Sequence, residues 1–187
     1  MSGNVRAAPR TRRDWGWHPL SDAWARRLVA EAGVRPGELV LDVGAGDGAL
    51  TRHLVSAGAR VVAVELHPRR AATLRQLFAD APVTVVQVDV RDLLLPRRAF
   101  RVVASPPYGV TSDLLRLLLA RGSRLVDARL VLQRAAARRL AAGRASGAGR
   151  WEARWELEVG RSVPRTAFRP PPRVDSVVLE VRRRRTR

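Results

Sequence analysis

A ten-residue stretch, 39–48, constrains the fold of this chain more than any other. It reads Leu-Val-Leu-Asp-Val-Gly-Ala-Gly-Asp-Gly, so an apolar run leads into a turn with three glycines, and a helical pattern begins at Ala49. Glycine tolerates positive φ and has no Cβ, so backbone N–H groups and the positive end of the next helix can lie close to a ligand. The spacing G-x-G-x-G differs from the dinucleotide fingerprint G-x-G-x-x-G, and the lysine of a P-loop is missing. Alone, the stretch predicts either a nucleotide-binding strand, turn and helix or an ordinary tight turn.

Short β-rich runs alternate with helical patterns through the middle of the chain. We expect helices at 48–56, 68–78 and 111–121, and strands at 39–43, 60–65, 83–89, 100–104 and 129–132. The strands are almost continuously apolar, as burial on both faces of a parallel sheet requires. The alternation predicts an α/β fold with a doubly wound sheet.

The two ends of the chain follow other patterns. Apolar residues from Leu20 to Leu28 recur at helical spacing and stop before Gly33, which predicts an N-terminal helix. Residues 138–150 indicate a frayed helix end and a mobile loop, and 151–159 alternate between apolar and charged residues like a half-buried strand. A last strand at 174–181 is expected to pair antiparallel with it at the sheet edge.

Composition excludes several kinds of chemistry. Cysteine is absent, and the three histidines are widely separated, so neither a disulfide, a thiolate nucleophile nor a metal site is expected. No apolar run approaches the roughly 18 residues of a membrane span, and the first thirteen residues lack the apolar segment of a secretory signal. We expect a cytoplasmic, metal-free monomer with no membrane partner.

Charge is unevenly distributed along the chain. The net charge is +18, and every one of the 35 basic side chains is arginine. Residues 36–95 hold six arginines and seven acids, whereas 161–187 hold nine arginines and two acids, and 134–150 hold five arginines and no acid. A near-neutral site with basic flanks fits a small-molecule pocket beside a nucleic-acid surface. The alternative is a solvated basic face.

Two acids follow strands at positions where carboxylates can bind a nucleoside cofactor. Glu65 ends the second expected strand, nineteen residues after Gly46, where a carboxylate can accept hydrogen bonds from ribose hydroxyls. Asp89 ends the third, where a carboxylate can accept from an adenine amino group. The pair indicates the layout of an S-adenosylmethionine site, although each acid alone is compatible with a solvated strand end.

The sequence Ser105-Pro106-Pro107-Tyr108 follows the fourth expected strand and matches the [N/D/S]-P-P-[Y/F] signature of methyltransferases that act on the amino nitrogen of a base. The lone pair of that nitrogen is delocalised into the ring, so an acceptor side chain and a backbone carbonyl are needed to hold its N–H bonds and aim it at the methyl donor. The prolines stiffen the loop, and the tyrosine offers a face on which an extruded base can stack.

Motifs spread over most of the chain carry a family resemblance. They are Asp42-Val43-Gly44-Ala45-Gly46-Asp47-Gly48-Ala49-Leu50-Thr51, Val64-Glu65, Val88-Asp89, Pro107-Tyr108, Leu132-Gln133-Arg134 and Phe168-Arg169-Pro170-Pro171-Pro172-Arg173-Val174-Asp175-Ser176. In order and spacing they resemble the ribosomal RNA adenine N6-methyltransferases, which include the Erm enzymes of macrolide resistance and the small-subunit dimethyladenosine transferases. The resemblance covers residues 16–182 and is greatest to the short Erm proteins of mycobacterial type.

The resemblance implies a class I S-adenosylmethionine-dependent methyltransferase fold: a Rossmann-like, mostly parallel seven-stranded sheet with an antiparallel C-terminal edge. It implies metal-free methyl transfer from S-adenosylmethionine to N6 of an adenine in 23S ribosomal RNA, with S-adenosylhomocysteine as product. That modification gives resistance to macrolide, lincosamide and streptogramin B drugs. Residues 1–15 would be a flexible basic arm, 16–182 the catalytic domain and 183–187 a basic tail.

Site roles follow from the resemblance, residue by residue. Cofactor binding falls on His18, Gly44, Ala45, Gly46, Glu65, Leu66, Asp89, Val90 and Ser105. Ser105 and the Pro106 carbonyl would hold the target amino group, and Tyr108 with Phe168 would cover the two faces of the flipped base. RNA binding falls on Arg12, Arg13, Arg134, Arg138, Arg139, Arg182, Arg183 and Arg184.

The chain departs from the family pattern in three places. Most relatives have asparagine at the position of Ser105, and their N-terminal Gln-Asn-Phe-Leu is Trp17-His18-Pro19-Leu20 here. The small helical RNA-binding domain of Erm enzymes is also not expected, so RNA binding would depend on the basic segments. Two alternatives remain: a DNA methyltransferase acting on cytosine N4 or adenine N6, suggested by the serine, and a non-catalytic RNA-binding assembly factor of the same fold.

Overall fold

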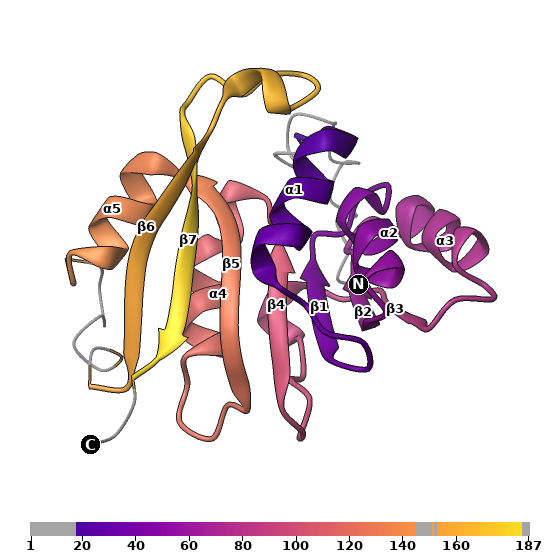
Figure 1. Ribbon diagram of the computed structural model, residues 1–187, viewed down its shortest axis with the longest axis horizontal. Helices are drawn as coiled ribbons and strands as arrows, with labels where there is room; N and C mark the ends of the chain where they lie inside the picture. Colours follow the sequence, from indigo (N-terminus) through magenta and orange to yellow (C-terminus); the bar gives the residue numbers. More distant parts are fainter. Residues whose placement is uncertain (1–17, 145–150, 152, 185–187) are drawn as a thin grey trace, which may run out of the picture.

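The computed structural model describes residues 18–144, 151 and 153–184, which form one seven-stranded sheet with helices on both faces (Figure 1). The strands are β1 (Leu39–Val43), β2 (Arg60–Val64), β3 (Val83–Val86), β4 (Phe100–Ala104), β5 (Leu125–Gln133), β6 (Trp155–Val163) and β7 (Ser176–Arg183). The helices are α1 (Asp22–Ala32), α2 (Ala49–Ser56), α3 (Pro68–Leu77), α4 (Thr111–Leu118) and α5 (Arg134–Ala141), with 3-10 turns η1 (Val90–Asp92), η2 (Tyr108–Val110) and η3 (Arg165–Ala167).

The strand order is β3-β2-β1-β4-β5-β7-β6. Strands β1 to β5 are parallel, and the chain order reverses between β1 and β4. In open sheets of this kind, ligands bind at the carboxyl ends of the strands beside such a reversal. The alternation of the sequence predicts this doubly wound sheet, and the order is that of the class I methyltransferase fold that the family resemblance implies.

Strand β7 runs antiparallel to both of its neighbours. Ser176, at its start, pairs with Gln133 and Val163, so the β6–β7 loop, residues 164–175, lies at the carboxyl ends of the parallel strands. Arg182, near its end, pairs with Asp127 at the opposite, amino end of the sheet. The predicted antiparallel pairing of the last two strands is therefore confirmed, and it brings the β6–β7 loop beside the switch point.

Both faces of the sheet are covered. Leu41 and Val43 of β1 point into a core shared with α4 and α5, whereas Val40 points into a second core shared with α1 and α2. Helix α3 packs through Leu74 on the α1–α2 side of β2. The continuous burial of β1 explains why its sequence reads as an unbroken apolar run. Within the described residues, no helix is long and apolar enough to cross a membrane.

An arginine network fixes the amino end of the sheet. The guanidinium of Arg101, in β4, lies 2.9 Å from carboxylate oxygens of both Glu38 and Asp127. It also donates to the carbonyls of Ala32 and Gly33, which are left free where α1 ends. One side chain thus joins the end of α1, the entry to β1 and two adjacent strands.

Several element boundaries differ from the prediction. Strands 39–43 and 100–104 are found as expected, but β3 stops at Val86, short of Asp89, and β5 begins four residues before 129. Of the described residues before β6, Trp151 is not strand and a turn lies at 153–154, and β6 instead continues to Val163. In the segment predicted as a frayed helix end, residues 138–141 belong to regular helix α5. Residues 145–150 lie outside the described part.

Candidate active site

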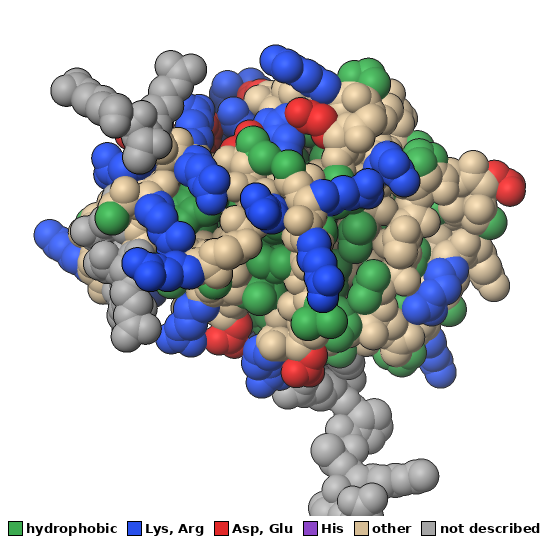
Figure 2. Space-filling view, turned by 90° about the horizontal axis from the view of Figure 1, so that it is seen from below, with side chains coloured by type: hydrophobic (Ala, Val, Ile, Leu, Met, Phe, Trp, Pro, Cys, Tyr) green, Lys and Arg blue, Asp and Glu red, His purple; other side chains and the backbone are tan. Residues whose placement is uncertain are grey.

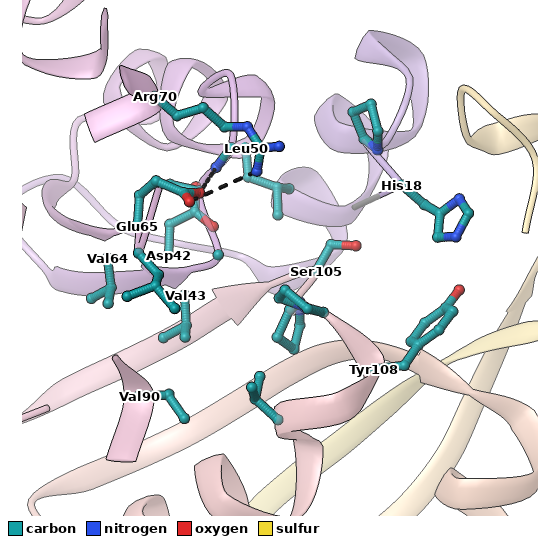
Figure 3. A pocket seen from close by; sticks show the side chains of 18 of the residues that line it. His18, Asp42, Val43, Leu50, Val64, Glu65, Arg70, Val90, Ser105 and Tyr108 are labelled. Atoms are coloured by element: carbon teal, nitrogen blue, oxygen red, sulfur yellow. Dashed lines mark hydrogen bonds and ion pairs between the residues drawn. The ribbon is translucent and has the colours of Figure 1, made fainter. Parts of the chain in front are cut away.

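A cavity of about 450 Å³ opens at the carboxyl ends of β1, β2 and β4 (Figure 3). This volume is within the range of small-molecule sites, about 300 to 1,000 Å³. Its walls come from the glycine turn, the segments that follow β2, β3 and β4, the N-terminal residues 18–20 and Phe168. Segments that are far apart in the sequence therefore meet in one place.

The glycines of the turn have different tasks. Gly44 has φ +78°, and a Cβ on it would lie 2.8 Å from Cδ of Pro107. It therefore lets the Pro-Pro loop pack directly on the turn. Gly46 donates its N–H to Glu65 at 2.8 Å, and a Cβ on Gly48 would meet the ring of Phe78 at 2.9 Å. The prediction treated all three as making room for a ligand, whereas two of them make room for other parts of the chain.

Glu65 is held rigidly beside the turn. Its side chain is 5% exposed, and its two carboxylate oxygens accept the backbone N–H groups of Gly46 and His67, both at 2.8 Å. The guanidinium of Arg70 lies 3.8 Å away and also lines the cavity. Sequence reasoning missed Arg70, whose only signal is its place in the first turn of the helix that follows Glu65.

Asp42 is the second residue that sequence reasoning missed as a site residue. It is 1% exposed, its Oδ2 accepts from the Thr51 hydroxyl at 2.7 Å, and it lines the cavity. Burial, with the nearby Glu65 charge adding to it, raises the pKa of Asp42 to about 7. Its Oδ1 is buried without a hydrogen-bond partner among the described residues. An acid inside an otherwise apolar buried strand was the available signal.

Asp89 lies in the cavity wall but not at a strand end. It caps η1, and its carboxylate accepts the Arg91 backbone N–H at 3.0 Å and the Arg91 guanidinium at 2.6 and 2.9 Å. A ligand amino group at this position would share the carboxylate with Arg91. Ala45, Leu66 and Val90, which were also predicted to contact the cofactor, line the same cavity.

The Ser-Pro-Pro-Tyr loop leaves the end of β4 and forms the next wall. In Figure 3, Ser105 and Tyr108 lie on the side of the cavity away from Glu65. The Tyr108 hydroxyl lies 2.7 Å from the Ser176 hydroxyl at the start of β7. Burial raises the pKa of Tyr108, which favours the protonated phenol further.

Residues 18–20 and the β6–β7 loop close the cavity beside Tyr108. Nδ1 of His18 lies 2.9 Å from the Pro170 carbonyl, and the imidazole ring stacks on Tyr108 with centroids 6.2 Å apart. Leu20 forms a β-bridge with Phe168, which is 2% exposed. His18 therefore lies next to the predicted base-binding tyrosine, while Glu65 lies at the other end of the cavity (Figure 3).

Acidic side chains dominate the charge of the cavity. Of the residues that the structure describes, two arginines line it, Arg70 and Arg91, against five acids: Asp42, Asp47, Glu65, Asp89 and Asp113. The unpaired Oδ1 of Asp42 and this surplus of carboxylates fit a positively charged ligand with several hydrogen-bond donors. Among the described residues, no cluster of three or more His, Asp or Glu side chains is arranged to hold a metal ion.

The predicted RNA-binding arginines divide between the two ends of the sheet. Arg134, Arg138 and Arg139 lie in α5, which starts at the carboxyl end of β5. Arg182, Arg183 and Arg184 lie at the amino end, where Arg184 donates to the carbonyl of Trp155 in β6. Arg12 and Arg13 lie outside the described residues.

Comparison with known proteins places this geometry in a family. The model of the family described as ribosomal RNA adenine dimethylase matches residues 11–187. The chain is 40% identical to the ribosomal RNA small subunit methyltransferase A of Thermosynechococcus vestitus, over 95% of this chain and 71% of that protein. It is 38% identical to the mycinamicin-resistance protein of Micromonospora griseorubida, over 78% of this chain and 47% of that protein.

Solved structures give the same result. The 23S rRNA methyltransferase ErmE matches with a TM-score of 0.79 and 32% identity, over 88% of this chain and 69% of that chain. A dimethyladenosine transferase from Plasmodium falciparum shares the fold, with a TM-score of 0.74 and 24% identity, over 89% of this chain and 64% of that chain. The chain spans less than two thirds of the length of several relatives, for example 60% of the rRNA methyltransferase of Streptomyces thermotolerans.

Proposed function

This chain belongs to the ribosomal RNA adenine dimethylase family, and from that premise we propose that it transfers methyl groups from S-adenosylmethionine to N6 of an adenine in 23S ribosomal RNA. The product would be S-adenosylhomocysteine. The modification would protect the ribosome of its host cell against macrolide, lincosamide and streptogramin B drugs. The 38% identity to a mycinamicin-resistance protein supports this outcome.

One observation carries the proposal: the glycine turn and the Ser-Pro-Pro-Tyr loop form two walls of a single cavity. Gly44 lies so close to Pro107 that no side chain fits between them. A group held by the turn and an amino nitrogen held by Ser105 would therefore share one cavity. Close approach in a fixed orientation is what methyl transfer to a weakly nucleophilic nitrogen requires.

The residues of the turn side fit S-adenosylmethionine. Its cationic ammonium and sulfonium groups suit the acidic lining, and the unpaired Oδ1 of Asp42 can accept one of its donors. Glu65 is fixed by two backbone N–H groups and has lone pairs left for ribose hydroxyls. Asp89 would take the adenine amino group. When bound, the cofactor supplies an electrophilic methyl group.

The residues of the loop side would hold the target base. Ser105 and the Pro106 carbonyl would accept the amino N–H bonds and orient the lone pair. Tyr108, fixed by its contact with Ser176, would stack on one face of the extruded adenine, with Phe168 toward the other. His18 is stacked on Tyr108, so it would have to move or share that face with the base.

Small-subunit ribosomal RNA is a second candidate substrate, favoured by the 40% identity to small subunit methyltransferases A from two organisms. The two candidates share the same chemistry and differ in the RNA that reaches the cavity. Expression in a macrolide-sensitive bacterium, followed by mass spectrometry of 23S and 16S RNA, separates them. A new N6-methyladenine in 23S RNA with raised macrolide tolerance is expected. Methylation confined to 16S RNA, or only in DNA, would overturn the assignment.

A pair of variants tests the role of the loop. Tyr108→Ala removes the stacking face and is expected to lower kcat/KM by about 10- to 100-fold, the range that loss of one base–aromatic stack implies. Tyr108→Phe keeps the ring and loses only the contact with Ser176, so a decrease of about fivefold or less is expected. Equal decreases in both variants would contradict stacking on Tyr108.

A further inference from the structure

The amino end of the sheet, opposite the cavity, carries an unusual concentration of arginine. Three segments meet there: 93–99 before β4, 119–124 before β5, and 182–184 at the end of β7. Together they hold seven arginines and no acid. We call this set the amino-end arginine cluster: Arg97, Arg98, Arg121, Arg124, Arg182, Arg183 and Arg184.

Sheet pairing brings these segments into contact. Strands β4 and β5 are neighbours, and the Phe100 N–H donates to the Arg124 carbonyl, so the two loops run side by side. The guanidinium of Arg183 lies 3.5 Å from the Ser123 carbonyl, which joins the end of β7 to the same loop. The cluster is therefore one continuous surface built by three adjacent strands.

The cluster is exposed and poorly neutralised. All seven arginines of the cluster are exposed to solvent. Within the described part of the chain, Arg182 alone among them has an ion-pair partner, Glu180. Of the acids at this end, Glu38 and Asp127 are occupied by Arg101, and exposed Glu156, opposite Arg182 in the sheet, forms no ion pair within the described residues. Figure 2, which views the molecule from below, shows arginines across this face and acidic side chains toward its margin.

The opposite end of the sheet differs. Around the cavity, several arginines are paired with nearby acids, as in Arg91 with Asp89, Arg116 with Asp113 and Arg165 with Asp175. Among the described residues, only one of the seven cluster arginines is paired in this way. Uncompensated arginines repel each other, so their accumulation on one surface indicates a polyanionic partner.

We propose that the amino-end arginine cluster binds the phosphate backbone of ribosomal RNA at a second place, away from the adenine that enters the cavity. The inference rests on the proposed function for the identity of the RNA. Guanidinium groups match phosphate oxygens with two parallel hydrogen bonds, and several together give salt-dependent binding without base specificity. The RNA would thus be held at one end of the protein and modified at the other.

The distance between the cavity and the amino-end arginine cluster allows a test with RNAs of two sizes. Strand β7 spans eight residues, so its two ends lie about 25 Å apart. A short hairpin that carries the target adenine reaches the cavity but not the cluster. A larger fragment of the ribosomal RNA domain, with flanking helices, can contact both. Loss of the cluster should therefore matter only for the larger RNA.

The test compares two variants, each with four substitutions, with the wild-type full chain. The first changes Arg97, Arg98, Arg121 and Arg124 to Gln, which leaves the arginines that contact β6 in place. The control changes Arg26, Arg52, Arg69 and Arg75 to Gln, four exposed arginines on helices α1, α2 and α3. Both lose four charges, so a general effect of net charge affects them equally. Thermal unfolding confirms that both are folded.

The measured quantities are Kd from filter binding over a range of salt concentrations, and kcat/KM for methylation of both RNAs. For the larger RNA, the cluster variant should bind about tenfold or more weakly at about 0.1 M salt, and the slope of log K against log salt should shrink by about 2 to 4. Methylation of the short hairpin should stay within about twofold of wild type.

Each outcome has a defined meaning. If the cluster variant binds the larger RNA as the wild type or the control variant does, the inference is wrong, whether or not methylation occurs. The same holds if binding of hairpin and larger RNA falls equally, because the cluster would then act through the fold. If the wild type methylates neither RNA, the proposed function fails, and the binding comparison still decides whether this surface takes RNA.

Discussion

At the scale of single residues, Asp42 links the proposed cofactor site to the stability of the protein. Its pKa is raised to about 7 from an ordinary value of 3.8, because it is buried and close to Glu65. The folded chain therefore binds this proton more tightly than the unfolded chain does. The contribution of Asp42 to stability is fully present below about pH 4 and is lost as the pH rises through about 7.

Asp42→Asn should remove that dependence. In the ligand-free protein, the free energy of unfolding of the wild type relative to the variant should fall by a few kcal/mol between about pH 4 and pH 8, an amount on the order of 4 kcal/mol if the full shift is realised. Urea denaturation at a series of pH values measures it. Asp80→Asn, at an exposed position before β3, is the control. A pH-independent difference between the wild type and Asp42→Asn would contradict the raised pKa.

Arg101 is expected to stabilise the folded chain, because two carboxylates and two backbone carbonyls are paired with its guanidinium. Arg101→Met would leave Glu38 and Asp127 facing each other and two carbonyls of the α1 end without a donor. We expect a loss of about 3 kcal/mol, near the lower end for breaking a buried ion pair, since both acids are partly exposed. Urea denaturation at neutral pH tests this.

Arg52→Met is the matched control for that measurement. Arg52 forms an ion pair with Asp22 at 3.7 Å, but its side chain is 51% exposed. Exposed pairs contribute less than about 1 kcal/mol. Similar losses in the two variants would show that Arg101 does not join the elements as its contacts indicate.

At the scale of secondary-structure elements, the glycine turn is matched to the loop after β4. Gly44→Ala adds a Cβ 2.8 Å from Pro107 and imposes positive φ on a residue that disfavours it. We expect the loop to be displaced and methyl transfer to fall by about tenfold or more, since small displacements from the reactive geometry are costly. Initial rates at saturating cofactor and RNA measure this.

Variants at two other glycines separate backbone strain from the clash with Pro107. Gly37 has φ +81° with nothing within 4 Å of an added Cβ, so Gly37→Ala reports backbone strain alone. Gly48→Ala would disturb Phe78 and Leu74 of the α3 core instead. Both variants should lose stability and keep most of their activity per folded molecule. The prediction for Gly44 fails if its rate constant falls no further than theirs.

The same scale shows what the sequence can and cannot predict. Strands β1 and β4 were predicted to the residue because burial on both faces leaves an unbroken apolar signal. The start of β5 was missed because Asp127 interrupts the apolar pattern, and its partner Arg101 lies in a neighbouring strand. Trp151 fits the alternation of β6 without belonging to it, since a turn intervenes.

The candidate site was partly predictable for a related reason. Glu65 and Ser105 directly follow strands, so local pattern places them at the carboxyl edge. Arg70 and the buried oxygen of Asp42 become visible only when α3 and β1 are placed against each other in space. The contact of Gly44 with Pro107 spans more than sixty residues of sequence, and no local pattern reports such a distance.

At the scale of the whole molecule, net charge acts on stability. A charge of +18 on 187 residues creates self-repulsion in the folded state. Raising ionic strength from about 0.01 M to about 0.15 M shortens the Debye length from about 30 Å to about 8 Å. We expect the Tm of the ligand-free protein to rise by about 2 to 4 °C, as a gain of about 1 kcal/mol implies.

The variant with four Arg→Gln substitutions in the amino-end arginine cluster gives a second test of the salt dependence of Tm. It removes four like charges from one surface, so its Tm should rise less with sodium chloride than that of the wild type. Thermal scans followed by circular dichroism at several salt concentrations measure both. A Tm of the wild type that falls with salt would mean that ion pairs outweigh repulsion across the molecule.

The direction of β7 has a practical consequence. Because this strand runs away from the cavity, residue 184 lies at the end of the sheet opposite the proposed catalytic site. A protein immobilised on a sensor surface through its C-terminus would present the cavity to the solution and turn the arginine cluster toward the support. Tethering through a cysteine introduced at exposed Arg173, in the β6–β7 loop, would reverse the orientation. The two surfaces can thus be assayed one at a time on the same chip.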